Sequence, residues 1–284
     1  MTDLPALVPA VLALCHKAGD AICHHYHAPG DVAVESKHDD SPLTRADLDS
    51  HVILRDGLKE LLPQVPVLSE ESSAEHKARR HDWPLYWLVD PLDGTKEFVA
   101  GTGEFTVNVA LIDGHRPVLG VLYQPLPRLA YVGIPGFGAH CYRFSGNGEG
   151  DGEWEAESIH TRPLQAGAPL AILASRRHRG ERLQAALAWL EQAWGTLERH
   201  NSGSALKFCD LAQGDGDFYP RYSPCCEWDV AAGQALVEAA GGAVLGLDGK
   251  ALEYNRRDSL LSLPFLAIAD PGNALWQRYL DSSL

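Results

Sequence analysis

The sequence predicts a mixed α/β protein, with an α+β first part and an α/β second part that meet near residue 165. Two observations predict this class. Helical patterns come first and a series of short strand-like segments follows, whereas beyond residue 165 strand-like and helical segments alternate. A length of 284 residues suits one compact unit of two lobes, residues 1–165 and 166–284.

The first part opens with two predicted helices, residues 7–26 and residues 44–62. The first is rich in Ala and Leu, and the second places residues such as Leu54 and Leu58 at helical spacing. Pro63 ends the second helix, because proline has no N–H group with which to continue it.

Short strands follow these helices. They are predicted at residues 65–68, 86–89, 105–112, 118–123, 130–134 and 139–144. In residues 105–112 apolar and polar side chains alternate, which is typical of a half-buried strand. The glycine-rich residues 145–153 contain no GxxxxGK[ST] pattern, so we expect a hairpin tip or loop there and no phosphate-binding loop.

In the second part of the chain, predicted strands alternate with predicted helices. Its predicted elements are a strand at 170–174, helices at 181–194, 204–212 and 229–240, strands at 243–247 and 264–268, and a last helix that runs to the end. Gly241 and Gly242 end the third of these helices, as glycine commonly does.

The charge of the chain limits its partners. A formal net charge of −14 repels nucleic-acid polymers and anionic membrane surfaces. It also repels a phosphate substrate unless cations lie at the site. Any phosphate chemistry in this chain should therefore recruit a metal ion.

The N-terminal segment and the cysteines indicate the cellular compartment in which we expect the protein. The N-terminal segment carries Asp3 and lacks a basic start, so it does not resemble a signal peptide, and no apolar run approaches the ~18 residues of a membrane span. The six cysteines form no CxxC pair and show no zinc spacing; they are Cys15, Cys23, Cys141, Cys209, Cys225 and Cys226. We expect free thiols in a reducing cytoplasm.

The segment WLVDPLDGTKEF carries the first group of candidate metal ligands. An apolar strand leads to Asp90, Asp93 follows three residues later, and the carbonyl of Leu92 and the hydroxyl of Thr95 are close by. Carboxylate, carbonyl and water oxygens are the ligands that Mg²⁺ prefers. The sequence therefore predicts a magnesium site at the end of this strand.

Three further acids could complete the site. Glu70 follows a short strand, Asp47 lies in SPLTRAD, and Asp229 opens a predicted helix, where free N–H groups favour anions. Each feature alone is common: a DxxD turn is usually solvated, and a lone acid before a helix is usually its N-cap. Together the acids carry about −5, which two or three Mg²⁺ ions would neutralise and without which they would repel one another.

The combination is more specific than its parts. DPLDGTKEF, with LSEES before it and EWDVAAG far downstream, resembles the inositol-monophosphatase superfamily in the order and spacing of its metal motifs, and SPLTRAD resembles that family's N-terminal element. The resemblance implies a layered αβαβα sandwich with the active site between the lobes. Within the superfamily, the KEF that follows Thr95, ASRRH, GSALKFC and FYPRYSPCCEWD are similar to the bisphosphate nucleotidases. Cys225 and Cys226 stand directly before Glu227-Trp228-Asp229, where the resemblance leads us to expect small residues.

The resemblance also implies roles for particular residues. The metal ligands would be Glu70, Asp90, the Leu92 carbonyl, Asp93 and Asp229, which would hold two or three Mg²⁺ ions. Asp47, with Thr95 and Thr44, would accept the proton of the attacking water. The substrate would contact Glu70, Leu92, Asp93, Gly94, Thr95, Ser175, His178, Ser204, Lys207, Arg221 and Asp229.

The implied substrate is adenosine 3',5'-bisphosphate, a by-product of sulfate assimilation, which would be converted to AMP and phosphate. Inhibition by Li⁺ is implied by the same resemblance. The expected location is the cytoplasm; peripheral attachment to the inner face of the cell membrane and a homodimer stay open.

Other functions compete with this one. An inositol-1-monophosphatase or broad-specificity sugar phosphatase would share every metal ligand, and fructose-1,6-bisphosphatase activity is a further variant. A non-catalytic metal-binding regulatory protein would need a broken ligand set, which the sequence does not show. A transition-metal binder could use His24, His25 and His27 beside Cys23.

Overall fold

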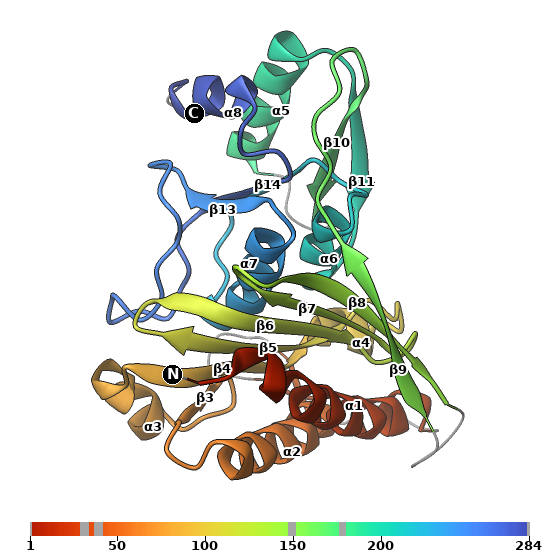
Figure 1. Cartoon of the computed structure of the whole chain (residues 1–284), viewed down its shortest axis with the longest axis vertical. Coiled ribbons are helices and arrows are strands. Elements are labelled where there is room, and N and C mark those ends of the chain that lie inside the picture. The colour runs from red at the N-terminus through yellow and green to blue at the C-terminus, as the bar shows by residue number, and fades with distance from the viewer. Residues whose placement is uncertain (1, 29–33, 37–41, 147–151, 176–179, 283–284) are drawn as a thin grey trace.

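The computed structural model describes residues 2–28, 34–36, 42–146, 152–175 and 180–282. Its helices and sheets stack in five layers, helix–sheet–helix–sheet–helix, from the first helices at one end of the molecule to the last at the other (Figure 1). The layered αβαβα fold implied by the sequence is therefore confirmed.

The first layer contains α1 (Leu4–His27) and α2 (Arg45–Leu61), which pack on one another, and the short paired strands β1 (Val34–Ser36) and β2 (Pro42–Thr44). By length and composition α1 could cross a membrane, but 44% of its most apolar stretch is buried inside the protein. This burial against α2 and the first sheet accounts for its apolar composition. His25 Nε2 lies 2.7 Å from Asp49 Oδ2 and links the two helices.

The second layer is a sheet that has seven strands within the described residues, in the spatial order β3 to β9. β3 runs parallel to β4 and every other neighbouring pair is antiparallel. The strands are β3 (Val67–Ser69), β4 (Leu85–Asp93), β5 (Thr106–Asp113), β6 (Arg116–Gln124), β7 (Leu129–Ile134), β8 (Gly138–Ser145) and β9 (Glu153–Ile159).

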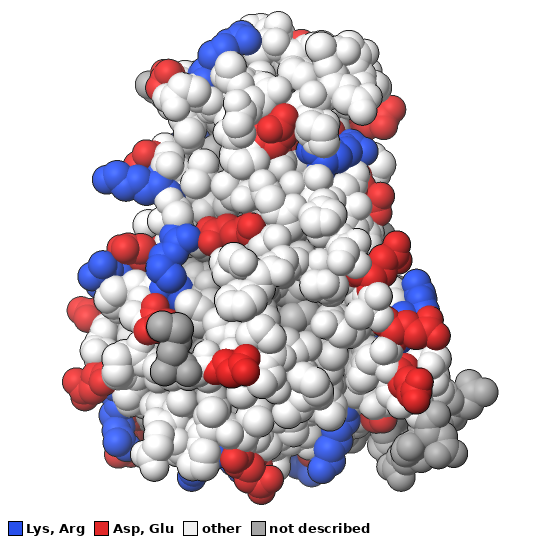
Figure 2. Space-filling model, in the orientation of Figure 1, with Lys and Arg blue, Asp and Glu red and all other residues white. Residues whose placement is uncertain are grey.

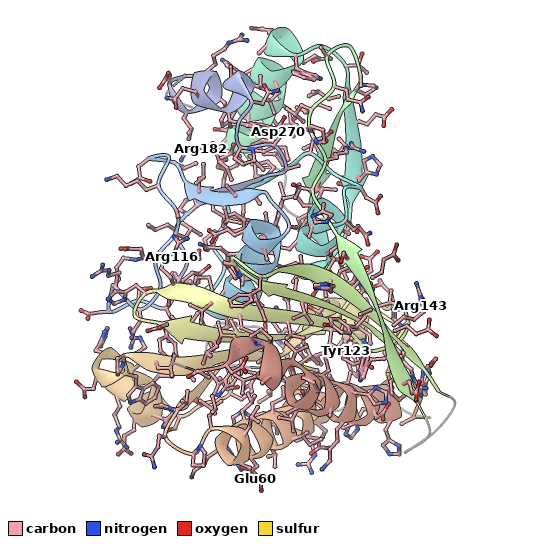
Figure 3. All side chains as sticks on the ribbon, viewed as in Figure 1. Glu60, Arg116, Tyr123, Arg143, Arg182 and Asp270 are labelled. Atoms are coloured by element: carbon pink, nitrogen blue, oxygen red, sulfur yellow. The ribbon has the colours of Figure 1, made fainter. Side chains whose placement is uncertain are left out.

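The middle layer consists of α6 (Leu206–Ala212) and α7 (Ala231–Ala239), and α7 lies directly on the first sheet. A Cβ atom on Gly133 would lie 2.3 Å from Leu236 Cα, so the backbones of β7 and α7 can approach only because this residue is glycine. Arg116 of β6 (labelled in Figure 3) binds both carboxylate oxygens of Glu238 on α7 at 2.9 and 3.0 Å.

The second sheet has five strands in the described residues, in the order β11-β10-β12-β14-β13. One face packs on α6 and α7, and the other on α5 (Glu181–Ala193) and α8 (Ala274–Leu280). β10, β11 and β12 are mutually parallel, whereas β14 runs antiparallel to both of its neighbours. The strands are β10 (Leu170–Ala174), β11 (Leu197–Asn201), β12 (Phe218–Arg221), β13 (Ala243–Gly246) and β14 (Phe265–Ile268).

Most predicted elements are present, but two expectations were wrong. β5 is not half-buried: residues 106–112 are buried on both faces, because the first helices cover one side of the sheet and α7 the other. Asp229 does not open a helix. It ends a 3-10 turn, η2 (Glu227–Asp229), and α7 begins two residues later.

Several elements were not predicted. They are β1, β2, β9, β11, β12, α3 (Ala74–Ala78) and η1 (Arg79–Asp82). The helix α4 (Thr95–Val99) begins at Thr95, with Gly94 as its N-cap, where a helix start was expected. Ser145 pairs with Glu153 on either side of the predicted hairpin tip, whose residues 147–151 lie outside the described part of the chain. β9 ends at Ile159 and β10 begins at Leu170, so the division into lobes near residue 165, which stays a proposal, falls in this connection.

The surface and the cysteines agree with the composition. On the face shown in Figure 2, acidic and basic side chains are interspersed, and the coloured residues form no continuous basic surface there. All six cysteines are free thiols.

Candidate active site

Two of the predicted ligands lie where β4 ends. The pairing of β4 with β5 is regular up to Asp90 and becomes irregular before Asp93, and Pro91 lies in this irregular stretch. Asp90 Oδ1 accepts a hydrogen bond of 3.0 Å from Leu92 N, and Ser50 Oγ donates one of 2.7 Å to Pro91 O. These bonds fix the turn that carries both carboxylates at the end of β4.

Asp229 reaches the same place from the middle layer. Its turn η2 lies just before α7, and Asp229 Oδ2 accepts a hydrogen bond of 2.9 Å from Cys226 N. One carboxylate oxygen from each of Asp90, Asp93 and Asp229 lies within 4.8 Å of the other two. Among the described residues this is the group of metal-binding side chains that lies close enough to hold an ion, and the histidines near Cys23 do not form one.

The electrostatics of these acids fit a divalent cation. Burial, together with the charges of Asp93 and Glu70, raises the pKa of Asp229 to about 8. Carboxylates packed this closely cannot all be ionised unless positive charge lies among them. Hard oxygen ligands with surplus negative charge are the donors that suit Mg²⁺, so the residues present fit the implied metal.

The two other predicted ligands lie beside this group. Glu70 follows β3, and its backbone N–H donates a hydrogen bond of 3.0 Å to Val89 O on β4. Its charge acts on Asp229, although it is not one of the three acids whose oxygens lie within 4.8 Å of each other. The Leu92 carbonyl accepts a hydrogen bond of 3.2 Å from Thr95 Oγ1. Ligation by these two residues stays a prediction.

The three predicted catalytic residues form one hydrogen-bonded chain. Asp47 is buried, and its Oδ2 accepts from Thr44 N at 2.8 Å and from Thr44 Oγ1 at 2.5 Å. Its Oδ1 accepts from Thr95 Oγ1 at 3.1 Å. The arrangement caps the start of α2 and points one oxygen of Asp47 at Thr95, 48 residues away in the sequence.

Gly94 shapes the turn between Asp93 and Thr95. Its φ of 89° is in the left-handed region, and an added Cβ would lie 2.9 Å from Glu104 O. Glycine therefore lets α4 begin at Thr95 immediately after the acidic strand end.

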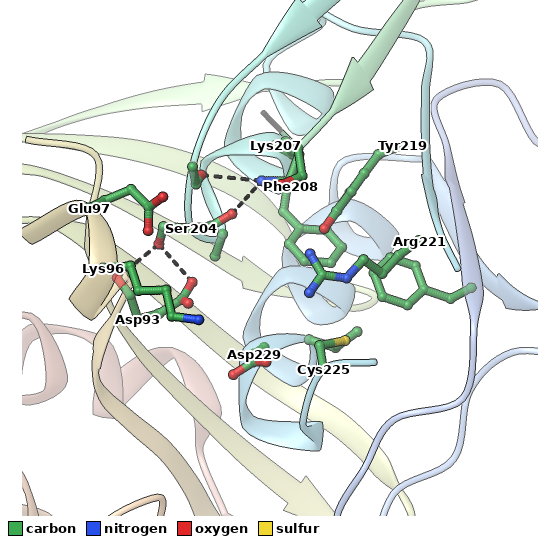
Figure 4. A pocket seen from close by; sticks show the side chains of 16 residues that line it. Asp93, Lys96, Glu97, Ser204, Lys207, Phe208, Tyr219, Arg221, Cys225 and Asp229 are labelled. Atoms are coloured by element: carbon green, nitrogen blue, oxygen red, sulfur yellow. Dashed lines mark hydrogen bonds between the residues drawn. The ribbon is translucent and has the colours of Figure 1, made fainter. Parts of the chain in front are cut away.

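A cavity of about 250 Å³ opens beside the acids (Figure 4). Seven predicted substrate contacts line it: Asp93, Gly94, Ser175, Ser204, Lys207, Arg221 and Asp229. Glu70, Leu92 and Thr95 lie outside its lining, and His178 lies outside the described residues. The lining also includes Lys96, Tyr219 and Cys225, which were not predicted as contacts. For Lys96 the available signal was its position directly after Thr95.

Ser204 and Lys207 shape one wall of the cavity. Ser204 has a φ of 49°, and its hydroxyl donates a hydrogen bond of 2.7 Å to Asp93 Oδ2. The ammonium group of Lys207 donates to three backbone carbonyls, those of Ser202, Gly203 and Ser204, at 2.9, 3.3 and 2.6 Å. Burial lowers the pKa of Lys207 to about 8.

The fold and this site define a protein class. The model of the inositol monophosphatase family matches residues 4–273, so the chain belongs to the inositol monophosphatase family. It is 40% identical to the 3'(2'),5'-bisphosphate nucleotidase CysQ of Escherichia coli strain K12 over 261 residues, which cover 91% of this chain and 98% of that protein.

Solved structures agree. The crystal structure of CysQ from Bacteroides thetaiotaomicron matches with a TM-score of 0.79 and 35% identity, over 92% of this chain and 97% of that chain. An IMPase/NADP phosphatase complexed with Mg²⁺ and phosphate matches with a TM-score of 0.75 over 99% of this chain and 95% of that chain. At 19% identity the second likeness concerns the fold alone.

Proposed function

We propose that this protein is a Mg²⁺-dependent 3'(2'),5'-bisphosphate nucleotidase, which hydrolyses adenosine 3',5'-bisphosphate to AMP and phosphate. The observation that carries the proposal is the convergence of Asp90, Asp93 and Asp229, each with one carboxylate oxygen within 4.8 Å of the others. They lie beside a cavity whose lining includes cationic side chains. The similarity to nucleotidases along 91% of the chain supports the choice of substrate.

In this proposal Glu70, Asp90, the Leu92 carbonyl, Asp93 and Asp229 hold two or three Mg²⁺ ions. When bound, the ions would supply positive charge to the phosphate oxygens, the attacking water and the leaving oxygen. The aspartates provide fixed, closely spaced negative charge for this purpose, and the hydrogen bonds of Asp90 to Leu92 N and of Asp229 to Cys226 N fix their orientation.

The chain from Thr95 to Asp47 is suited to remove a proton. Because Thr95 Oγ1 lies 3.1 Å from Asp47 Oδ1, it can pass its proton to that carboxylate while accepting one from the attacking water. Thr44 binds the other oxygen of Asp47 through both its N–H and its hydroxyl, so the carboxylate cannot rotate away. No covalent intermediate with the protein is required.

The remaining residues would position the substrate. The amides of Gly94 and Thr95 at the start of α4 would bind oxygens of the phosphate that is removed. The second phosphate and the adenosine would occupy the cavity, whose lining includes the predicted contacts Ser175, Ser204, Lys207 and Arg221. The predicted contact of His178 lies outside the described residues and stays a prediction.

Cellular context follows from the proposal. An enzyme that removes adenosine 3',5'-bisphosphate would serve sulfate assimilation, and a site built for Mg²⁺ would be inhibited by Li⁺. Six free thiols suit the cytoplasm. Peripheral membrane attachment and a homodimer stay predictions that await measurement.

The test is a phosphatase assay with adenosine 3',5'-bisphosphate, inositol 1-phosphate and fructose 1,6-bisphosphate, each with Mg²⁺ and with a chelator. We expect the nucleotide to give the highest kcat/KM and the chelator to abolish turnover. A preference for inositol 1-phosphate would instead favour an inositol monophosphatase. Full activity in the chelator would remove the metal from the mechanism.

A further inference from the structure

Three cationic side chains line the cavity, and they differ in how many N–H groups are already in use. They are Lys96, Lys207 and Arg221. A lysine ammonium has three N–H donors. Those of Lys207 have three carbonyl oxygens as partners, and its side chain is only 1% exposed. In this arrangement Lys207 holds the loop at Ser204, and each of its three donors already has a carbonyl partner.

Arg221 is partly engaged. Its Nε donates to Ser223 O at 3.2 Å and its Nη2 donates to Pro224 O at 3.1 Å. The guanidinium group has five N–H donors, so these two bonds fix its plane and leave others for a ligand in the cavity. With Arg221 alone, a second phosphate in the cavity would be bound by a cation on one side only.

Lys96 faces the same space from α4. It is exposed, and its side chain makes no hydrogen bond or ion pair with any residue in the described part of the chain. In Figure 4 its side chain extends from α4 toward the gap between Asp93 and Asp229, on the opposite side of the cavity from Arg221. Lys96 therefore brings an uncommitted positive charge to a wall that otherwise carries the acids Asp93 and Glu97.

We propose that Lys96 is a specificity-determining residue that binds the second phosphate of the substrate, the one that is not removed, and so selects bisphosphates over monophosphates. This inference rests on the proposed function. Once bound cations neutralise the aspartates, the ammonium group is no longer attracted to them, and a phosphate dianion in the cavity becomes its strongest partner.

The test compares Lys96→Gln with Lys96→Arg and with Lys17→Gln, a control at an exposed position on α1. For each protein, kcat/KM is measured with adenosine 3',5'-bisphosphate and with adenosine 3'-monophosphate, which lacks the second phosphate. We expect the ratio of the two values to fall about tenfold in Lys96→Gln, as the loss of one charged hydrogen bond implies. Lys96→Arg should keep most of the ratio, and Lys17→Gln all of it.

Two outcomes overturn the inference. An unchanged ratio in Lys96→Gln means that Lys96 does not bind the second phosphate. Equal losses on both substrates mean a general effect on the site and not on selectivity. The proposed function has a separate readout: if the wild-type protein prefers inositol 1-phosphate to both nucleotides, the function itself is wrong, whereas a wild-type preference for the bisphosphate leaves the function standing whatever Lys96→Gln does.

Discussion

Ser204 and Asp93 are 111 residues apart in the sequence, and the hydroxyl of Ser204 donates a hydrogen bond of 2.7 Å to Asp93 Oδ2. The bond joins the second half of the chain to an acid of the proposed metal site. Ser204 makes it from a left-handed backbone conformation, φ 49°, which serine rarely adopts. The three carbonyl bonds of Lys207 hold that loop in place.

The first prediction concerns this bond. Ser204→Ala should raise the Mg²⁺ concentration that gives half-maximal activity by roughly tenfold, because groups that orient a metal ligand typically contribute that much to affinity. The measurement is activity against Mg²⁺ concentration at saturating substrate. Ser158→Ala, at an exposed site on β9, is the control. Identical Mg²⁺ curves for Ser204→Ala and wild type would mean that the bond does not orient Asp93.

The second prediction concerns the chain from Thr95 to Asp47. Thr95→Val and Asp47→Asn should each lower kcat by about 10²–10⁴-fold, the range of general-base catalysis. Since both residues serve one proton transfer, the double variant should be scarcely slower than the slower single variant. Steady-state kinetics of the three variants decide this, with Thr102→Val as a control at an exposed site. Multiplicative losses would show that the two residues act separately.

The third prediction separates stability from activity at the acids. Asp93→Asn removes one of several mutually repelling carboxylates, so in a chelator its melting temperature should equal or exceed that of the wild type. Activity should fall by orders of magnitude, and the rise in melting temperature that Mg²⁺ gives the wild type should largely disappear. Thermal melts with and without Mg²⁺ provide the check. A variant that remains active and is still stabilised by Mg²⁺ would count against the ligand assignment.

The fourth prediction concerns the contact between α7 and the first sheet. Gly133→Ala should lower the free energy of unfolding by about 2 kcal/mol, because its Cβ would lie 2.3 Å from Leu236 Cα and backbone must move. In Gly272→Ala the nearest atom would be 3.8 Å away, so this variant serves as the control. Urea unfolding of both measures the effect. Equal stability of the two variants would show that α7 can shift without cost.

The sequence predicted the parts of the site that depend on neighbouring residues. Asp90 and Asp93 were recognisable because an apolar strand runs directly into them, and the end of the helix before Gly241 was predicted correctly because glycine ends helices. The parts of the site that the sequence could not predict depend on contacts between residues far apart in the chain. Nothing local to Ser204 indicates a bond to Asp93, and nothing local to Lys207 indicates that three carbonyls occupy its ammonium group.

The errors have physical causes as well. The alternation in β5 suggested one solvent-facing side, but Thr106 and Asn108 are buried polar residues that bond to each other at 2.6 Å under α7. β12 was missed because Pro220 interrupts the strand pattern of the sequence. In the structure Pro220 nevertheless pairs with Leu266 of β14 and is part of the sheet. Asp229 was placed in a helix because the alanines that follow it favour one, whereas its side chain bonds back to Cys226 N and closes a separate turn.

The most direct test of the central claim is a crystal structure of the protein with Mn²⁺ in place of Mg²⁺, examined by anomalous scattering. We predict at least one anomalous peak about 2.2 Å from carboxylate oxygens of Asp90, Asp93 and Asp229, as expected for a hard cation bound by oxygen ligands. Peaks only elsewhere on the molecule, or none at a saturating Mn²⁺ concentration, would contradict the account.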